Sequence, residues 1–286
     1  MARVLVAGVG AVGGRLAASL AASGHEVWGL RRTPGRMPAA VHEIVADLCD
    51  PATFDRLPDD LDVVIGCVGA DTFDESAYRN AYVDGPRHLL ATLAAAERPP
   101  RRVLWCSSTG VYGRSDGAWV DEDSPPEPSS WSGRVLLEGE AAVLAGPVPA
   151  SVVRLAGLYG PGRELFVQRL RSGEATCVGD PPQWVNLLHL DDAADALAHV
   201  AFLDRADDVY LAVDDEPTPR CELLRWLAAR LGCPGPRVVA ADEAPARRGT
   251  KRCRNLRLRG TGWRPRYPSY REGFDALLGV SGRDPR

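Results

Sequence analysis

Short apolar runs alternate with longer stretches rich in alanine and leucine through the first half of the chain. The apolar runs, which we expect to form strands, lie at residues 3–7, 26–30, 63–68, 103–107 and 151–155. Helices are expected between them, for example at 13–22 and 86–96. Because these strands are apolar throughout instead of alternating with polar residues, helices should cover both faces of the sheet. The pattern predicts an α/β fold, a doubly wound parallel sheet of the Rossmann type.

The second half of the chain has a looser pattern. The proline-rich stretch 122–132 is predicted to be a surface loop, and a further helix is expected at 134–144. After that, turn clusters separate short helices and strands. We therefore expect a Rossmann domain over residues 1–156 and a smaller C-terminal capping unit over 157–286, with about 183–213 returning to the sheet.

A glycine motif, GVGAVG, follows the first strand and opens the first helix. In that context G-x-G-x-x-G is typical of a dinucleotide-binding loop. Gly8 permits a tight turn, Gly10 lets the backbone approach a pyrophosphate, and Gly13 allows the helix to pack closely on the sheet. The helix N-terminus adds free N–H donors and a partial positive charge. The first unit is therefore predicted to bind a dinucleotide.

The end of the second strand indicates which dinucleotide. An acidic residue there would bind the ribose hydroxyls of NAD, but this chain has Arg31 and Arg32. Two guanidinium groups suit a ribose 2′-phosphate, which predicts NADP, with NAD as the other cofactor to consider. The alternative is a solvated loop in an arginine-rich protein. Asp47 is placed either to meet the adenine edge or to cap a helix.

Charge and hydrophobicity argue against nucleic acid and membrane as partners. The net charge is −4, with no basic block, which disfavours nucleic acid. No apolar stretch is long enough to span a bilayer. The glycines at 8, 10, 13 and 14, with Arg15 after them, also fit poorly with a signal peptide.

The seven cysteines are odd in number and include no C-x-x-C. Several lie within apolar runs, where a reduced cysteine behaves as a small hydrophobic residue. We therefore expect reduced thiols in a cytoplasmic protein, and no zinc site.

Longer motifs point to a family. The chain resembles the extended short-chain dehydrogenase/reductases, the NAD(P)-dependent epimerase/dehydratase group, and especially its atypical members. The segments that carry the resemblance are GVGAVGG, ADLCDP, YVDGPRHLL, VLWCSSTGVYG, VRLAGLYGPGR, NLLHLDDAADAL and KRCRNLRLRGTGWRPRYPSYREGF. With the glycine motif, the resemblance implies a cofactor site formed by Gly8, Gly10, Ala11, Val12, Gly13, Arg31, Arg32, Asp47, Leu48, Cys67, Val68, Gly69 and Arg134.

The resemblance also implies a catalytic serine. Counting back four residues from Tyr112 in S-S-x-x-V-Y-G gives Ser108, whose hydroxyl would hydrogen-bond a substrate oxygen beside the nicotinamide. The alternative is a serine that caps a turn at the end of a strand. Dehydratases of the family have Asp and Glu next, whereas this chain has Thr109 and Gly110, which argues against dehydration.

The family's proton donor is absent. It is a tyrosine whose pKa is lowered by a lysine four residues later. The only lysine of this chain is Lys251, and no tyrosine precedes it by four residues. Alignment on the downstream helix puts Ser130 or Trp131 at the tyrosine position and Arg134 near the lysine. An indole is no acid at accessible pH, and arginine stays charged.

Other residues are candidates to replace the missing pair. Tyr112 and Tyr159 are candidate proton donors, and Arg134 would bind either the nicotinamide ribose or a substrate carboxylate, unless it is a solvated helix residue. His189 titrates near neutrality, although in the family this segment is mostly structural. Water or the substrate itself would be a further source of the proton.

Two classes of function follow. The first is an NADP-dependent oxidoreductase or epimerase acting on a small carbonyl or hydroxyl substrate with a non-standard proton donor. The second is a non-catalytic NADP-binding sensor or scaffold, which the fold alone does not exclude. A homodimer through the helices at 86–96 and 134–144 is implied by the resemblance.

Overall fold

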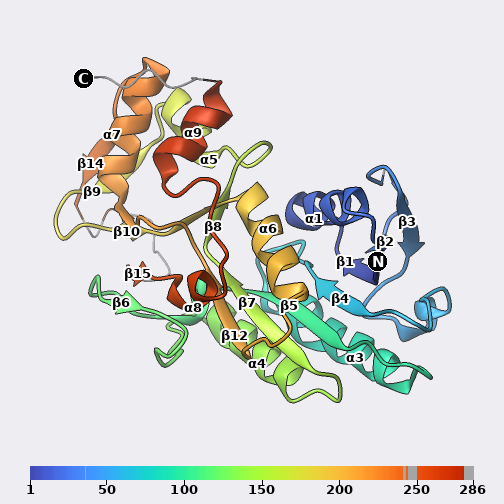
Figure 1. Cartoon of the computed structure of the whole chain (residues 1–286). Helices are drawn as coiled ribbons and strands as arrows, with labels where there is room; N and C mark the ends of the chain where they lie inside the picture. The colour runs from blue at the N-terminus through green and yellow to red at the C-terminus, as the bar shows by residue number, and fades with distance from the viewer. Residues whose placement is uncertain (36, 241–242, 244–249, 280–286) are drawn as a thin grey trace.

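A parallel sheet of seven strands forms the centre of the computed structural model, which describes residues 1–35, 37–240, 243 and 250–279. The strands run in the order β12-β7-β5-β4-β1-β2-β3 (Figure 1). Their bounds are Arg3–Ala7 for β1, Glu26–Arg31 for β2, Val41–Val45 for β3, Val63–Gly66 for β4, Arg102–Ser108 for β5, Ala150–Leu155 for β7 and Val209–Ala212 for β12. The predicted doubly wound α/β fold is confirmed.

The strand order changes direction at β1, which pairs with β2 on one side and β4 on the other. In open α/β sheets, ligands bind in the crevice outside the carboxyl ends of the strands at such a point. The five predicted strands all lie in this sheet. The sequence pattern missed β3, because this edge strand is mostly solvent-facing and its run VHEIV contains two polar residues.

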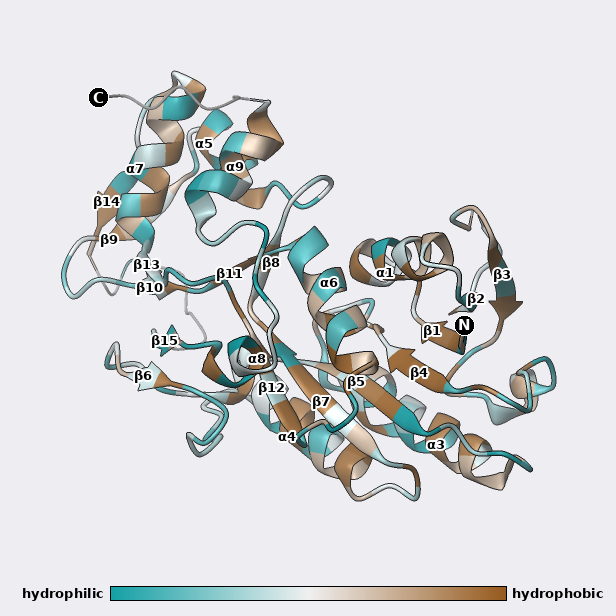
Figure 2. Ribbon diagram, viewed as in Figure 1, coloured by the Kyte–Doolittle hydropathy of each residue, from teal (hydrophilic) through white to brown (hydrophobic). Residues whose placement is uncertain are grey.

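Helices cover both faces of the sheet. Helices α1 (Ala11–Ala22) and α6 (Leu190–Ala201) lie on one face, and α3 (Gly85–Ala95) and α4 (Trp131–Leu144) lie on the other (Figure 1). Figure 2 shows the consequence, since the central strands are hydrophobic and the helices carry their polar residues outward. Two apolar cores, one on each side of the sheet, therefore hold the first unit together.

The remaining elements connect the sheet to a smaller unit. Its helices are α5 (Leu165–Arg171), α7 (Arg220–Leu231) and α9 (Tyr270–Leu278), with a third apolar core between them. The short elements are η1 (Pro51–Phe54), α2 (Glu75–Arg79), the π-helical turn η2 (Asn80–Asp84), η3 (Thr109–Val111), β6 (Trp119–Val120), β8 (Gly157–Tyr159), β9 (Thr176–Val178), β10 (Trp184–Val185), β11 (Leu187–His189), β13 (Thr218–Pro219), β14 (Arg237–Val239), β15 (Arg252–Cys253) and α8 (Leu256–Gly260). In Figure 1 the helices of this unit lie to one side of the sheet, with the strand pair β9–β14 beside α7.

One cysteine pair differs from the expectation that all thiols are reduced. Cys177 in β9 and Cys221 in α7 form a disulfide in the core of the smaller unit, with their Cα atoms 5.3 Å apart. The two residues are 44 positions apart in the sequence. Because that spacing matches no cysteine motif, only the packing of β9 on α7 brings the sulfurs together.

A buried polar network joins β5, α4 and β7 beneath the carboxyl edge of the sheet. The Arg154 guanidinium pairs with the Glu140 carboxylate, at 2.6 Å from Nη2 to Oε2, and both side chains are at most 5% exposed. The Ser107 hydroxyl donates to Glu140 at 2.6 Å. Breaking such a pair leaves an uncompensated buried charge, so this network should fix α4 firmly against the sheet.

We expect Glu140→Gln to lower the free energy of unfolding by about 3–5 kcal/mol, because the Arg154 charge would lose its buried counterion. Glu138→Gln is the matched control, since Glu138 lies on the same helix but pairs with Arg79 at the surface. Urea denaturation of both variants and the parent measures the difference. A Glu140 variant as stable as the control would contradict the assignment.

Candidate active site

The glycine loop leaves space for a phosphate group above the first helix. Gly8 has a φ of +98°, a backbone conformation that side chains disfavour. A Cβ atom on Gly13 would lie 2.0 Å from the Gly8 carbonyl oxygen, so α1 packs on the turn as closely as the backbone allows. At Gly10, a Cβ atom would meet nothing within 4 Å. This open position at the start of α1 is where a pyrophosphate fits.

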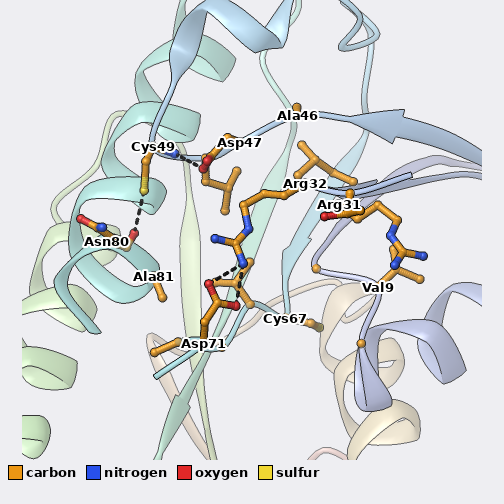
Figure 3. A pocket seen from close by; sticks show the side chains of 18 of the residues that line it. Val9, Arg31, Arg32, Ala46, Asp47, Cys49, Cys67, Asp71, Asn80 and Ala81 are labelled. Atoms are coloured by element: carbon orange, nitrogen blue, oxygen red, sulfur yellow. Dashed lines mark hydrogen bonds and ion pairs between the residues drawn. The ribbon is translucent and has the colours of Figure 1, made fainter. Parts of the chain in front are cut away.

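A pocket of about 500 Å³ continues from this loop along the carboxyl ends of β1, β2 and β4 (Figure 3). Of the thirteen residues predicted to bind the cofactor, those that line it are Gly8, Gly10, Arg31, Arg32, Asp47, Leu48, Cys67, Val68 and Gly69. The structure places Ala11, Val12 and Gly13 in the first turn of α1 directly beyond the loop, and Arg134 on the exposed side of α4.

The two arginines of the pocket have different surroundings. Arg32 crosses the pocket and pairs with Asp71 through Nη2, at 2.6 and 2.5 Å from the two carboxylate oxygens. Figure 3 shows Arg31 extending in another direction, beside Val9. The hydrogen bond to Asp71 raises the pKa of Arg32. Both guanidinium groups therefore lie at the pocket, but one of them already has an acidic partner.

Further pocket residues were not predicted from the sequence. They include Cys49, Asp71, Ala77, Asn80 and Ala81. Asp71 follows β4 by a few residues, so the rule that sites gather at the carboxyl ends of strands would have indicated it. Asp47 has a partly structural role, because its Oδ1 accepts a hydrogen bond from the Cys49 backbone N–H at 2.9 Å.

Ser108 is the last residue of β5, the strand next to β4. Its hydroxyl oxygen accepts a hydrogen bond from the Gly110 backbone N–H at 3.1 Å, so it caps the turn η3. The side chain is half-buried, and its hydroxyl hydrogen remains available for a substrate oxygen. Capping and substrate binding are thus compatible at this position.

Tyr112 is placed unfavourably for proton transfer. It is 1% exposed, and its hydroxyl donates to the Asp121 carbonyl oxygen at 2.7 Å while accepting from Arg154 at 2.6 Å. Burial raises the pKa of Tyr112 to about 12. The hydroxyl belongs to the buried network beneath the site, and its proton is held by a backbone carbonyl. A proton-donor role for Tyr112 stays a prediction, and one that this placement disfavours.

Tyr159 and His189 lie in the interior between the sheet and the smaller unit. The Tyr159 ring stacks on Phe274, and its hydroxyl lies so close to Gly273 of α9 that a Cβ atom there would be 1.8 Å away. Burial raises the pKa of Tyr159 and lowers that of His189. His189 Nδ1 accepts from the Asp191 N–H at the start of α6. Both side chains therefore support packing, and a proton-donor role for Tyr159 stays a prediction that this placement disfavours.

Trp131 is the first residue of α4, directly after the N-cap Ser130. Its ring packs against Phe73 and Tyr78, with ring centroids 5.0 Å from each. Lys251 is buried just before β15, which pairs with β6. Of the two residues at the expected tyrosine position, Ser130 caps α4 through its hydroxyl oxygen and Trp131 has no acidic proton.

The open glycine turn before α1, the pocket at the topological switch point and the serine at the end of β5 agree with the resemblance seen in the sequence. The sequence profile of the NAD dependent epimerase/dehydratase family matches residues 4–210. The chain belongs to this family.

Two proteins that align with nearly the whole chain support this membership. The 3-diazoavenalumate denitrifying reductase of a Streptomyces species is 31% identical, with 95% of this chain and 99% of the relative aligned. A solved structure from Methylobacillus flagellatus, described as an NAD-dependent epimerase/dehydratase, is 36% identical, has a TM-score of 0.81 and covers 98% of both chains.

The fold of human epimerase family protein SDR39U1, solved with NADPH, is also similar. Its TM-score is 0.81 at 21% identity, over 98% of this chain and all of that one. Members of the NAD dependent epimerase/dehydratase family are nicotinamide-dependent enzymes, and the glycine cradle of this chain fits such a cofactor. Within the described residues, no helix is both long and apolar enough to cross a membrane.

We expect Tyr112→Phe to destabilise this epimerase/dehydratase family member without weakening NADPH binding. The variant leaves a buried arginine N–H and a carbonyl oxygen without their partner, a loss of about 1–3 kcal/mol. Thermal unfolding and calorimetric titration with NADPH measure the two effects. A stable variant with impaired turnover would restore Tyr112 as a proton donor.

Proposed function

We propose that this protein is an NADP-dependent reductase that transfers hydride to a small-molecule substrate at the carboxyl edge of the sheet. The observation that carries the proposal is the open cradle at Gly10, which leads into a pocket lined by Arg31 and Arg32. When bound, the reduced dinucleotide would supply the hydride. Ser108, at the end of the neighbouring strand β5, would orient the substrate through a hydrogen bond.

Reduction is favoured over epimerisation because the sequence has no tyrosine–lysine pair to serve as acid and base. An epimerase of this kind must remove a hydroxyl proton while hydride leaves the same carbon, and that requires a base with a suitable pKa. Tyr112 and Tyr159 are buried, with pKa values raised by burial, and no tyrosine is followed by lysine at the fourth position. A one-way reduction needs no such base in the protein, since water or the substrate itself supplies the proton.

One hydride acceptor requires no proton at all. The Streptomyces relative is named for reducing and denitrifying a 3-diazo compound, and we propose the same class of acceptor here. In the overall reaction, the C4–H bond of the dihydronicotinamide breaks with its electron pair and a C–H bond forms on the aromatic ring. The ring C–N bond breaks, N2 leaves, and NADP⁺ carries the positive charge that the aryl diazonium brought. Atoms, charge and electrons balance without an acidic side chain.

A second candidate is a sensor or scaffold that binds NADP without turnover. Steady NADPH consumption with a carbonyl or diazo substrate separates the two, because a sensor binds the dinucleotide and does not oxidise it. The half-buried hydroxyl of Ser108 beside the cofactor pocket favours the enzyme. Cytoplasmic location and a homodimer through α3 and α4 stay predictions.

The two arginines of the pocket should determine which dinucleotide binds more tightly. Each guanidinium that meets the 2′-phosphate forms a charge-assisted hydrogen bond worth about 1.5–3 kcal/mol. The exposed pair between Arg32 and Asp71 is worth only about 0.2–1 kcal/mol, so the phosphate should displace the carboxylate. We expect NADPH to bind about tenfold or more tightly than NADH.

Calorimetric titration of both dinucleotides tests this, with the double variant Arg31→Ala, Arg32→Ala and with Asp71→Asn. The double variant should lose the preference and keep its NADH affinity. Asp71→Asn frees Arg32 and should strengthen NADPH binding alone. If the parent binds both dinucleotides equally, the arginines are only surface charge.

Substitution of Ser108 tests its proposed role in orienting the substrate. We expect Ser108→Ala to lower NADPH oxidation by about tenfold or more, because one hydrogen bond to the reacting substrate is lost. Trp131→Phe should have a much smaller effect, since an indole donates no catalytic proton. A suitable assay uses 3-diazo-4-hydroxybenzoate as acceptor, with the uncatalysed rate subtracted. Equal losses in both variants would overturn the role of Ser108.

A further inference from the structure

Four aromatic side chains gather where the β4–α2 loop meets the start of α4. The Phe73 and Tyr78 rings lie 5.5 Å apart between centroids, edge to face, and each lies 5.0 Å from Trp131. Tyr82 extends the group, at 5.2 Å from Tyr78. We call these four residues the aromatic cluster.

Helix formation explains only part of this cluster. Asp74 caps α2, so Phe73 precedes the cap and Tyr78 is the fourth helical residue, an arrangement known as a hydrophobic staple. The staple accounts for the contact between Phe73 and Tyr78. It does not require Trp131, and it leaves Phe73 63% exposed to solvent. Large exposed aromatic side chains beside a pocket are typical of ligand-binding surfaces.

The cluster lies between the dinucleotide pocket and Ser108. On one side, Asp71 and Ala77 line the pocket and flank Phe73 in the sequence. On the other side, the first turn of α4 packs on the η3 turn, where a Cβ atom on Gly133 would lie 2.7 Å from the Gly110 carbonyl oxygen.

Helix α4 is also held against the turn η2. A Cβ atom on Gly139 would lie 2.0 Å from the Tyr82 carbonyl oxygen, so the two backbones touch. The buried pair of Glu140 and Arg154 anchors the same helix on the sheet. The Trp131 ring is therefore supported by a rigid base, which lowers the entropy cost of binding a ligand on it.

A positive charge lies next to the aromatic surface. Arg134 is three residues after Trp131 on α4, and residues with this spacing are neighbours on one side of a helix. The Arg134 side chain is exposed. A guanidinium beside an aromatic face suits a planar ring that carries a carboxylate.

We propose that Phe73 and Trp131 bind the ring of a planar aromatic substrate and that Arg134 binds its carboxylate. This subsite rests on the proposed reductase function and specifies the substrate as an aromatic acid. It places the ring beside Ser108, at the edge of the sheet where the dinucleotide lies. It also gives Trp131 a role at the position where the family has its acid.

The test uses 4-hydroxybenzoate as an unreactive probe, titrated calorimetrically into protein saturated with NADP⁺. We expect Trp131→Ala to weaken its binding at least about fivefold, because aromatic stacking is lost. Trp131→Phe should retain most of the affinity. Trp119→Ala is the matched control, because Trp119 is another partly exposed tryptophan that lies on β6, and its loss should leave the affinity unchanged.

A second pair of titrations tests the arginine. Arg134→Gln should weaken 4-hydroxybenzoate at least about fivefold and leave the neutral 4-hydroxybenzamide unaffected, since only the carboxylate meets the guanidinium. Unchanged affinity in Trp131→Ala, equal losses for acid and amide in Arg134→Gln, or no binding by the parent would overturn the proposal. Failure of the proposed function appears differently, as a parent that binds no NADPH.

Discussion

The contact between Gly13 and the carbonyl oxygen of Gly8 is the constraint on which the site depends. Because neither residue has a side chain there, α1 approaches the β1 turn until the backbones touch. This approach directs the free N–H groups of the helix toward the open space at Gly10. A methyl group at Gly13 would separate helix from sheet and close that space. The position of the phosphate site, and of the pocket that continues from it, follows from this single contact.

The other candidate functional residues also lie at this edge of the sheet, for a related reason. Parallel strands end on the same side, so Gly8 after β1, Arg31 at the end of β2 and Ser108 at the end of β5 come together there. The pair of Glu140 and Arg154 then fixes α4, which contributes an indole where an acid is expected. Under the proposed function, this site binds the dinucleotide and supports hydride transfer, while the sequence has no tyrosine–lysine pair for proton transfer.

The sequence was sufficient for the fold and for most of the lining of the pocket at the glycine loop. Strand β1 has the predicted bounds, and nine of the thirteen predicted cofactor residues line the pocket, because local apolar runs and glycine spacing encode these features. The ion pair between Arg32 and Asp71 and the Cys177–Cys221 disulfide depend on contacts between distant segments, which no local pattern records. Burial, which raises the pKa of Tyr112 and Tyr159 and disfavours both as proton donors, is likewise a property of the folded chain that no local pattern records.

The central claim is that hydride moves in this site without a proton from a protein acid. Single-turnover oxidation of NADPH by 3-diazo-4-hydroxybenzoate tests it most directly, with deuterium at the transferred C4 position in one series and D2O as solvent in the other. We expect deuteration at C4 to slow the step, because that bond breaks, and D2O to leave the rate nearly unchanged, because no proton is in flight. A markedly slower step in D2O, with or without an effect of C4 deuteration, would contradict the account.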